Sequence, residues 1–239
     1  MDQNRRKRPV PVLTSRQSAA ERILALVWLP IHLFLLPNLA IRLFPTMEES
    51  WLNIVIYGTG AVYMLATQFH FLRRDFDPLC DHPFRVLLEV FVSYGAMLLL
   101  NMGLNAILLT VWDGLAENPN NAAVVDMALV NSGPVAALAV FLAPLVEEPI
   151  FRAGIFGTLR QKNRLAAYLV SMLIFAVYHV WGYAWIDPMA WIYLLQYLPI
   201  AYLLCRIYER TDSLWSCILL HMLVNYIALH ALTFLEKMI

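Results

Sequence analysis

The chain is poor in charge and in cysteine. Only 14% of its 239 residues are charged and 61% are apolar, whereas soluble domains average about 25% charged residues. Seventeen basic and seventeen acidic residues cancel to zero, so the total charge indicates no nucleic-acid partner. Cys80, Cys205 and Cys217 are too few for a disulfide framework and are expected to be small packing residues. So large an apolar fraction cannot be hidden in one soluble core, and the composition predicts a polytopic membrane protein.

Seven apolar segments have the length of roughly 20 residues that a helix needs to cross a bilayer. They lie at about 23–44, 51–72, 84–111, 134–158, 165–184, 189–208 and 213–235. Runs of this length favour helices over barrel strands, which are about ten residues long. The predicted fold is therefore an all-α membrane protein with seven transmembrane helices. Pro30 and Pro37 should bend the first helix, and the polar segment 112–133 could form a short interfacial helix in its second half.

The basic residues mark one face of the membrane. Fourteen of the seventeen lie in the N-terminus and in the loops after the second, fourth and sixth segments. The loops 45–50, 112–133 and 185–188 contain no Lys or Arg. Because basic loops stay in the cytoplasm, this pattern predicts a cytoplasmic N-terminus and an outer C-terminus. We expect a multi-pass integral protein, in the inner membrane if the source is bacterial.

Three parts follow along the chain. Residues 1–22 form a basic cytoplasmic N-terminus, residues 23–132 hold three helices and an outer loop, and residues 133–235 hold a core of four helices. A cleaved signal peptide is an alternative for the N-terminus, but the apolar run from Ile23 is too long for one and indicates a signal anchor.

The densest group of intramembrane charges lies in APLVEEPIFRAG, residues 143–154. Glu148 and Arg152 are four residues apart, so they share a helix face and can form an ion pair with a structural role. Glu147 is turned by about 100° and stays available. Pro149 cannot donate a backbone hydrogen bond, and we expect a kink there beside a wet internal cavity.

Two later helices carry polar side chains at similar depth. Phe175 and His179 lie one turn apart, as do His221 and Asn225. At about 1.5 Å per residue, Glu147 lies roughly 20 Å from the outer helix end, close to the depth of the two histidines. One carboxylate, two imidazoles and a carboxamide are therefore expected to meet in a buried polar site between helices 4, 5 and 7.

Other buried polar residues have structural explanations. Glu89 lies near the inner interface beside Arg85 and is expected to pair or to extend toward water. Single intramembrane histidines usually make hydrogen bonds between helices, and this interpretation applies to His32, His70 and His230.

The ordered motifs EExxxR (Glu147, Glu148, Arg152), FxxxH (Phe175, His179) and HxxxN (His221, Asn225) resemble a known family of intramembrane proteases. This is the CAAX-protease and bacteriocin-processing family, also called CPBP or Abi, which includes the CAAX prenyl endopeptidases. The likeness covers about residues 133–232, and the first three helices carry no motif. One departure is Ala153, where the family often has Gly.

The resemblance implies hydrolysis of a peptide bond in a membrane-associated protein or peptide. Glu147 would be the catalytic carboxylate that activates water, and His221 would assist as a second base or as a ligand of water or metal. His179 and Asn225 would stabilise the oxyanion. Glu148 and Arg152 would hold the fourth helix in position.

The sequence also lacks the motifs of other hydrolases. No GxSxG or HExxH occurs, which disfavours an acyl-enzyme route. Glu147, His179 and His221 could hold zinc or another divalent metal with an open position, or could activate water without metal. The residues alone do not decide between these two options.

Two competing functions remain open. A non-catalytic immunity or partner-binding protein could keep the same fold. A proton-coupled transporter also uses buried Glu and His, although such proteins often show internal repeats and the Glu-rich segment occurs once here. The sequence favours the endopeptidase, and it does not reveal the substrate or whether the substrate is prenylated.

Overall fold

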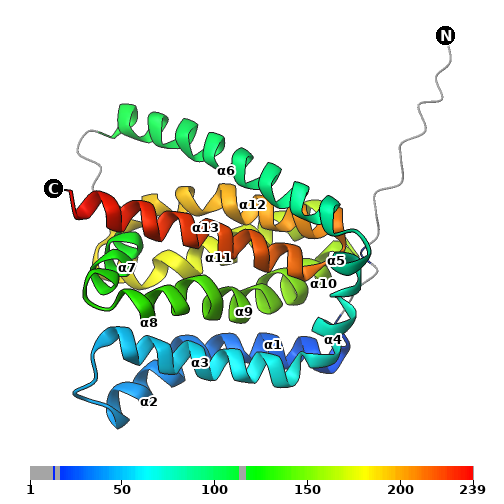
Figure 1. The fold of residues 1–239 in the computed structure, drawn as a ribbon, viewed down its shortest axis with the longest axis horizontal. Helices are drawn as coiled ribbons and strands as arrows, with labels where there is room; N and C mark the ends of the chain where they lie inside the picture. Colours follow the sequence, from blue (N-terminus) through cyan, green and yellow to red (C-terminus); the bar gives the residue numbers. More distant parts are fainter. Residues whose placement is uncertain (1–12, 14–16, 113–116, 239) are drawn as a thin grey trace.

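A computed structural model describes residues 13, 17–112 and 117–238 of the chain, all of them helical or in turns and connections (Figure 1). The N-terminal elements are α1 (Ala19–Pro30), η1 (Ile31–Leu35), α2 (Leu36–Leu43), α3 (Glu49–Thr67), α4 (Phe69–Arg74), α5 (Asp77–Asp81) and α6 (Pro83–Val111). The later elements are α7 (Pro119–Val130), α8 (Ser132–Ala136), η2 (Ala137–Leu142), α9 (Ala143–Glu148), η3 (Pro149–Phe156), α10 (Gly157–Arg160), α11 (Arg164–Ile186), η4 (Pro188–Tyr193), α12 (Leu194–Thr211) and α13 (Leu214–Glu236).

The protein is an all-α integral membrane protein, as the sequence predicts. Six helical stretches of the described chain are long and apolar enough to cross a bilayer. They are Ala19–Leu43, Pro83–Val111, Ser132–Arg160, Arg164–Ile186, Pro188–Thr211 and Leu214–Glu236. The second predicted span corresponds to α3, a helix of 19 residues that is not among these six. Seven spans and a cytoplasmic N-terminus therefore stay predictions.

Two of the π-helical segments begin at a proline or directly after one. Pro30 ends α1, and the next five residues form the π-helical segment η1 before α2 continues the same stretch. Pro149 begins a second π-helical segment, η3, directly after Glu148. Proline removes a backbone donor, which shifts the hydrogen-bond register of the helix around it. The expected irregularity at Pro149 therefore lies beside the paired glutamates.

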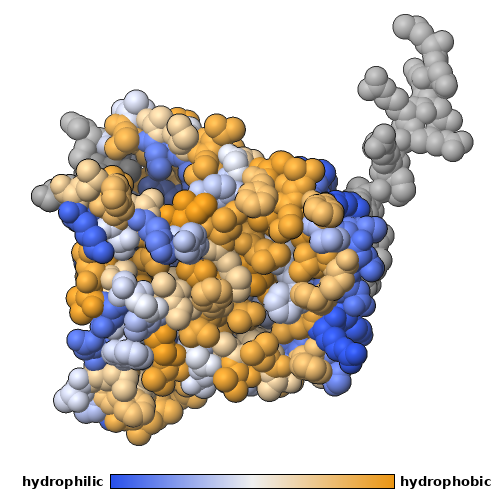
Figure 2. Space-filling model, in the orientation of Figure 1, coloured by the Kyte–Doolittle hydropathy of each residue, from blue (hydrophilic) through white to orange (hydrophobic). Residues whose placement is uncertain are grey.

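Polar side chains join several connections at one end of the bundle. The backbone N–H of Leu214 donates to the Asp75 carboxylate, and Ser213 Oγ donates to the Asp75 carbonyl at 2.8 Å. At the same end, Glu209 accepts from Arg160 and Arg164. Figure 2 shows hydrophilic residues gathered where α4 and α5 lie in Figure 1, next to an apolar band across the middle. The basic loops that the charge pattern assigns to the cytoplasmic face thus lie together at this end of the bundle.

Helix α3 packs closely against α9 because Gly60 has no side chain. A Cβ atom at Gly60 would lie 2.9 Å from Val146 Cγ2 and 3.2 Å from Trp28 Nε1. Val146 is fully buried and immediately precedes Glu147. This contact therefore holds α3 against the helix that carries the paired glutamates.

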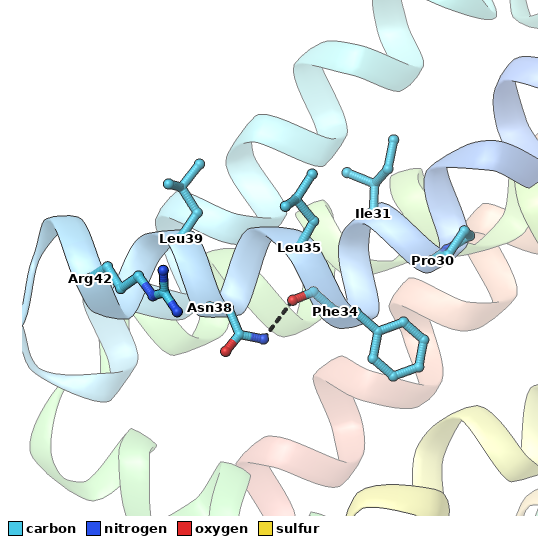
Figure 3. Close-up of a pocket in the computed structure, with 7 residues that line it drawn as sticks. All are labelled: Pro30, Ile31, Phe34, Leu35, Asn38, Leu39 and Arg42. Atoms are coloured by element: carbon cyan, nitrogen blue, oxygen red, sulfur yellow. Dashed lines mark hydrogen bonds between the residues drawn. The ribbon is translucent and has the colours of Figure 1, made fainter.

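A surface groove of about 570 Å³ follows η1 and α2. In Figure 3 the Asn38 side chain donates to the Phe34 carbonyl at 2.7 Å, within the same helical stretch. Apart from Asn38 and Arg42 the groove is lined by apolar residues. It shares no residue with the polar cluster described next.

Candidate active site

Helix α9 and the start of η3 bury three ionisable side chains in the fourth predicted span. Glu147 is 3% exposed, and Glu148 and Arg152 are fully buried. The junction between α9 and η3 is held by Gln17, whose side chain donates to the Pro149 carbonyl at 3.2 Å. A segment outside the four-helix core therefore satisfies a backbone group at the irregular turn.

The expected pair of Glu148 and Arg152 is present. Arg152 Nε lies 3.3 Å from Glu148 Oε2, and both side chains are inaccessible to solvent. The guanidinium lies over the ring of Phe175, with 4.1 Å between Cζ and the ring centroid. This cation–π contact joins η3 to α11.

His221 of α13 lies between the two glutamates. Its Nδ1 is 2.8 Å from Glu148 Oε1, and its Nε2 is 4.0 Å from Glu147 Oε2. Because a carboxylate paired with arginine accepts hydrogen bonds, Nδ1–H is the donor. The other ring nitrogen, Nε2, faces Glu147. The sequence did not predict that Glu148 would orient this imidazole as well as pair with Arg152.

His179 of α11 has an equivalent arrangement. Its Nδ1 lies 2.8 Å from the Phe175 carbonyl, and its Nε2 is 3.8 Å from Glu147 Oε2. A carbonyl can only accept, so the proton is on Nδ1 and the neutral ring also directs an Nε2 lone pair at Glu147. An oxyanion-stabilising role for this imidazole would therefore require a second proton on Nε2.

Asn225 is one turn beyond His221 and lines the same cavity as Glu147. Its Nδ2 donates to the Ala139 carbonyl of η2 at 2.7 Å. A carboxamide nitrogen carries two hydrogens, so one N–H stays available. The π-helical segment η2 thus sets the orientation of this amide.

Three tyrosines, which the motifs did not indicate, surround the cluster. The hydroxyls of Tyr57 and Tyr178 are 2.9 Å apart, which joins α3 to α11. Tyr197 of α12 stacks on the His179 ring, with centroids 4.6 Å apart. Tyr178 is next to His179 in the sequence, but Tyr57 and Tyr197 come from helices without a motif. Only their positions in space identify them.

The cluster opens into a cavity of about 910 Å³. Glu147, His179, His221 and Asn225 all line it, as do residues of α3, α6, α7 and α12. The structure thus brings together all four residues proposed from the sequence. Glu148 and Arg152 are buried behind this wall, where they contact His221 and Phe175.

The proposed metal ligands were compared with the geometry of a metal centre. No group of three or more His, Cys, Asp or Glu side chains within the described chain is placed to hold a metal ion. The Nε2 atoms of His179 and His221 are 3.8 and 4.0 Å from the same carboxylate oxygen of Glu147. As placed, the three side chains do not form a three-ligand metal site.

Outside the cluster, Glu89 has different partners from the one expected. It contacts Arg210 at 2.5 Å and Arg206 at 3.8 Å, whereas Arg85 donates to the Arg210 carbonyl. Arg206 and Arg210 lie one turn apart on α12, which faces Glu89 across the helix interface. The partners of Glu89 therefore come from another helix, and the spacing of residues within α6 could not predict them.

Buried His32 packs edge-on against Tyr57, with 4.5 Å between ring centroids. His230 Nδ1 donates to the Tyr226 carbonyl of its own helix α13 at 2.8 Å, and not to another helix as expected. The three cysteines are free thiols, with Cys205 and Cys217 buried and Cys80 exposed. The two histidines and the three cysteines do not line the cavity.

Comparison with known proteins finds that the same segment is similar to a protease family. The profile of the family described as type II CAAX prenyl endopeptidase Rce1-like matches residues 130–227. A protein of Lactococcus lactis subsp. lactis (strain IL1403), UPF0177 protein YxdF, is 30% identical over 95 residues, which is 40% of this chain and 48% of that protein. The protein named "Putative membrane peptidase YdiL" of Bacillus subtilis (strain 168) is 31% identical over 111 residues, 46% of this chain and 41% of that protein.

These matches span less than half the length of either relative. No solved structure matches the chain significantly. All seven motif residues, from Glu147 to Asn225, lie inside the matched segment.

Proposed function

Since residues 130–227 belong to the Rce1-like family of type II CAAX prenyl endopeptidases, we propose that this protein is an intramembrane endopeptidase whose Glu147 activates water. The observation that carries the proposal is the convergence of two imidazole Nε2 atoms on one buried carboxylate oxygen, at 3.8 and 4.0 Å. No side chain described in the structure, the two imidazoles included, donates a hydrogen bond to that oxygen. A water molecule to one side of these atoms, within hydrogen-bond distance of both rings and the carboxylate, is the proposed nucleophile.

In the proposed first step, Glu147 removes a proton from water and the water oxygen forms a bond to the peptide carbonyl carbon. The lone pair of His221 Nε2 accepts the second water hydrogen and so orients the nucleophile. A positioned base of this kind contributes about 10²–10⁴-fold to the rate. The bond from His221 to Glu148 fixes the ring for this task.

The carbonyl oxygen becomes negative as the tetrahedral intermediate forms. The second N–H of Asn225 is the proposed donor to this oxyanion, since its first N–H is held by Ala139. The Glu147 carboxylic acid then gives its proton to the leaving nitrogen as the carbon–nitrogen bond breaks. The products are a carboxylic acid and an amine, and Glu147 returns to its ionised form.

The test is a comparison of membrane proteomes from cells with the wild-type protein and with Glu147→Gln. Glutamine keeps the size of the side chain and cannot act as a base. We expect uncleaved precursors to accumulate in the variant while the protein itself stays at normal abundance in the membrane. Purified wild-type protein should then cleave one of those precursors, and Glu147→Gln should not.

Two results would favour the competing functions. If the cellular phenotype of the protein survives Glu147→Gln, a non-catalytic partner-binding role is indicated. If no precursor accumulates but proton-coupled uptake into vesicles is lost, the buried Glu and His groups serve transport.

A further inference from the structure

The cavity of Glu147 reaches the end of the bundle opposite the arginine-rich loops. Glu49, Asn105, Glu117 and Asn121 line its outer part, from α3, α6 and the start of α7; we call these four residues the outer mouth. Figure 1 shows α7 and α5 at opposite ends of the molecule, and the C-terminal half of α6 diverging from α13. With the N-terminus in the cytoplasm, the outer mouth faces the outside.

The lining of the cavity carries negative charge only. Glu49, Glu117 and Glu147 line it, and none of its described residues is Lys or Arg. Two buried acceptors, Glu147 Oε2 and Asn101 Oδ1, have no hydrogen-bond partner within the described chain. Clefts of one sign with low-dielectric walls concentrate ions of the opposite sign, and unpaired buried acceptors favour a ligand that donates hydrogen bonds.

Carboxamides join the walls of the mouth. Asn118 Nδ2 donates to Gln196 Oε1 at 2.8 Å, and Gln196 Nε2 donates to Asn105 Oδ1 at 3.1 Å. This chain connects α6, α12 and the start of α7. Further carboxamides, Asn120 and Asn121, line the cavity beside it. A carboxamide offers both a donor and an acceptor and can therefore pair with the peptide groups of a bound chain.

The depth of the cavity suits an extended chain. From Pro134 at the outer helix end to Glu147, a rise of 1.5 Å per residue gives roughly 20 Å. An extended peptide advances about 3.3 Å per residue, so roughly six residues reach from the mouth to the carboxylate. A folded domain would be too wide for this space, which also holds the tyrosines around His179.

We propose that the outer mouth is a binding site for an extended peptide segment that enters from the outside and carries a positive charge about six residues from the scissile bond. The identity of the occupant as a peptide rests on the proposed endopeptidase function. The preference for a cation rests on the charge of the lining residues, and the side of access rests on their position together with the orientation predicted from the basic loops. A lysine, an arginine or a free amino terminus supplies such a charge.

The side and the charge can be measured without a substrate. Asn121→Cys is introduced into the full chain with Cys80→Ser, and the single exposed thiol is treated in intact cells with two membrane-impermeant methanethiosulfonates. One reagent carries a trimethylammonium group and the other a sulfonate. The unmodified chain serves as the reference for the opposite side, because its exposed Cys80 lies at the arginine-rich end.

We expect Asn121→Cys to react in intact cells and Cys80 to react only after permeabilisation. The rate of each reagent is divided by its rate with free 2-mercaptoethanol. At Asn121→Cys this normalised rate should be about tenfold higher for the cationic reagent than for the sulfonate, which is the lower range for focusing by a charged cleft. Adding Glu49→Gln and Glu117→Gln should remove most of that preference. Asp126→Asn is the matched control, since Asp126 is an exposed acid on α7 that does not line the cavity.

Labelling of Asn121→Cys only after permeabilisation, or equal rates with both reagents, would overturn the proposal. A second arm maps cleavage sites in the precursors that accumulate with Glu147→Gln. Outer-side sites with Lys, Arg or a free amine about six residues away support the peptide assignment. Sites on the cytoplasmic side or flanked by acids contradict it and leave the endopeptidase intact. Expected labelling without any precursor would instead count against the peptidase function.

Discussion

His221 holds the two adjacent glutamates of α9 in different roles, with Nδ1 2.8 Å from Glu148 Oε1 and Nε2 4.0 Å from Glu147 Oε2. One nitrogen is occupied by an inner carboxylate, and the other faces the cavity. Of the two adjacent glutamates, Glu148 orients the His221 ring and Glu147 faces the cavity.

Substitutions that keep one nitrogen of His221 separate these roles. In His221→Asn the amide nitrogen occupies the position of Nδ1 and can still donate to Glu148, but nothing replaces Nε2. We expect near-normal thermal stability in detergent and a loss of cleavage of about 10²–10⁴-fold. His221→Leu should lose both thermal stability and cleavage activity, because Glu148 then loses a hydrogen-bond donor as well. Equal activity of His221→Asn and the wild type would refute a role for Nε2.

Arg152 is expected to contribute mainly to stability. Arg152→Met leaves the fully buried Glu148 without its cation, and breaking a buried pair costs about 3–5 kcal/mol. The free energy of unfolding in mixed micelles should fall by that order, with partial activity retained. The control is Arg74→Met. Arg74 pairs with Glu21 at 3.9 Å, and its own side chain is exposed. Such a pair should contribute less than about 1 kcal/mol. An inactive but fully stable Arg152→Met would contradict this assignment.

Asn225→Ala tests the proposed oxyanion donor. Loss of one donor at an oxyanion typically lowers kcat by about 10²–10³-fold, and we expect that loss with little change in KM. Asn38→Ala is the matched control, because Asn38 Nδ2 also donates to a backbone carbonyl at 2.7 Å but lies in the surface groove of α2 (Figure 3). If both variants lose only stability, Asn225 is a packing residue.

Gly60 tests whether the contact of α3 with α9 supports the site. In Gly60→Ala the new Cβ meets Val146 at 2.9 Å, and overpacking of this kind costs about 1–3 kcal/mol. We expect lower stability and lower activity, since Val146 precedes Glu147. Gly58→Ala lies on the same helix with no atom within 4 Å of the added Cβ and should be neutral. Similar unfolding temperatures for the two variants would exclude this coupling.

Metal dependence is tested on purified protein with an identified substrate. Because the described side chains form no three-ligand group, we expect cleavage to persist after treatment with EDTA and 1,10-phenanthroline. Elemental analysis of the active protein should find less than one metal ion per chain. Loss of activity on chelation, restored by zinc, would show that the site rearranges around a metal.

Much of the fold and the site follows from local sequence patterns. The length of the apolar runs predicts the helices, and spacing by four residues predicts the Glu148–Arg152 pair and the shared face of His221 and Asn225. Contacts between distant segments were not predictable in this way. Gln17 on the Pro149 carbonyl and the partners of Glu89 depend on how separate helices pack, which no short-range spacing encodes.

The second span illustrates a different difficulty. Helix α3 is a long apolar helix in the structure, yet it carries Asn53, Tyr57 and Thr59 and falls outside the six stretches that qualify as membrane spans. Asn53 and Tyr57 line the cavity, so its polar residues serve the interior. A helix that borders a polar cavity is less apolar than one surrounded by lipid. Composition therefore identifies such a helix as a membrane span less clearly.

The cavity walls have two separate origins along the chain. Glu147, His179, His221 and Asn225 come from the segment shared with the family, whereas α3, α6 and much of α7 lie before residue 130. Natural variation could therefore exchange the mouth while the reacting groups stay constant. Grafting α3 to α7 from one relative onto the core of another should transfer substrate choice without altering the chemistry.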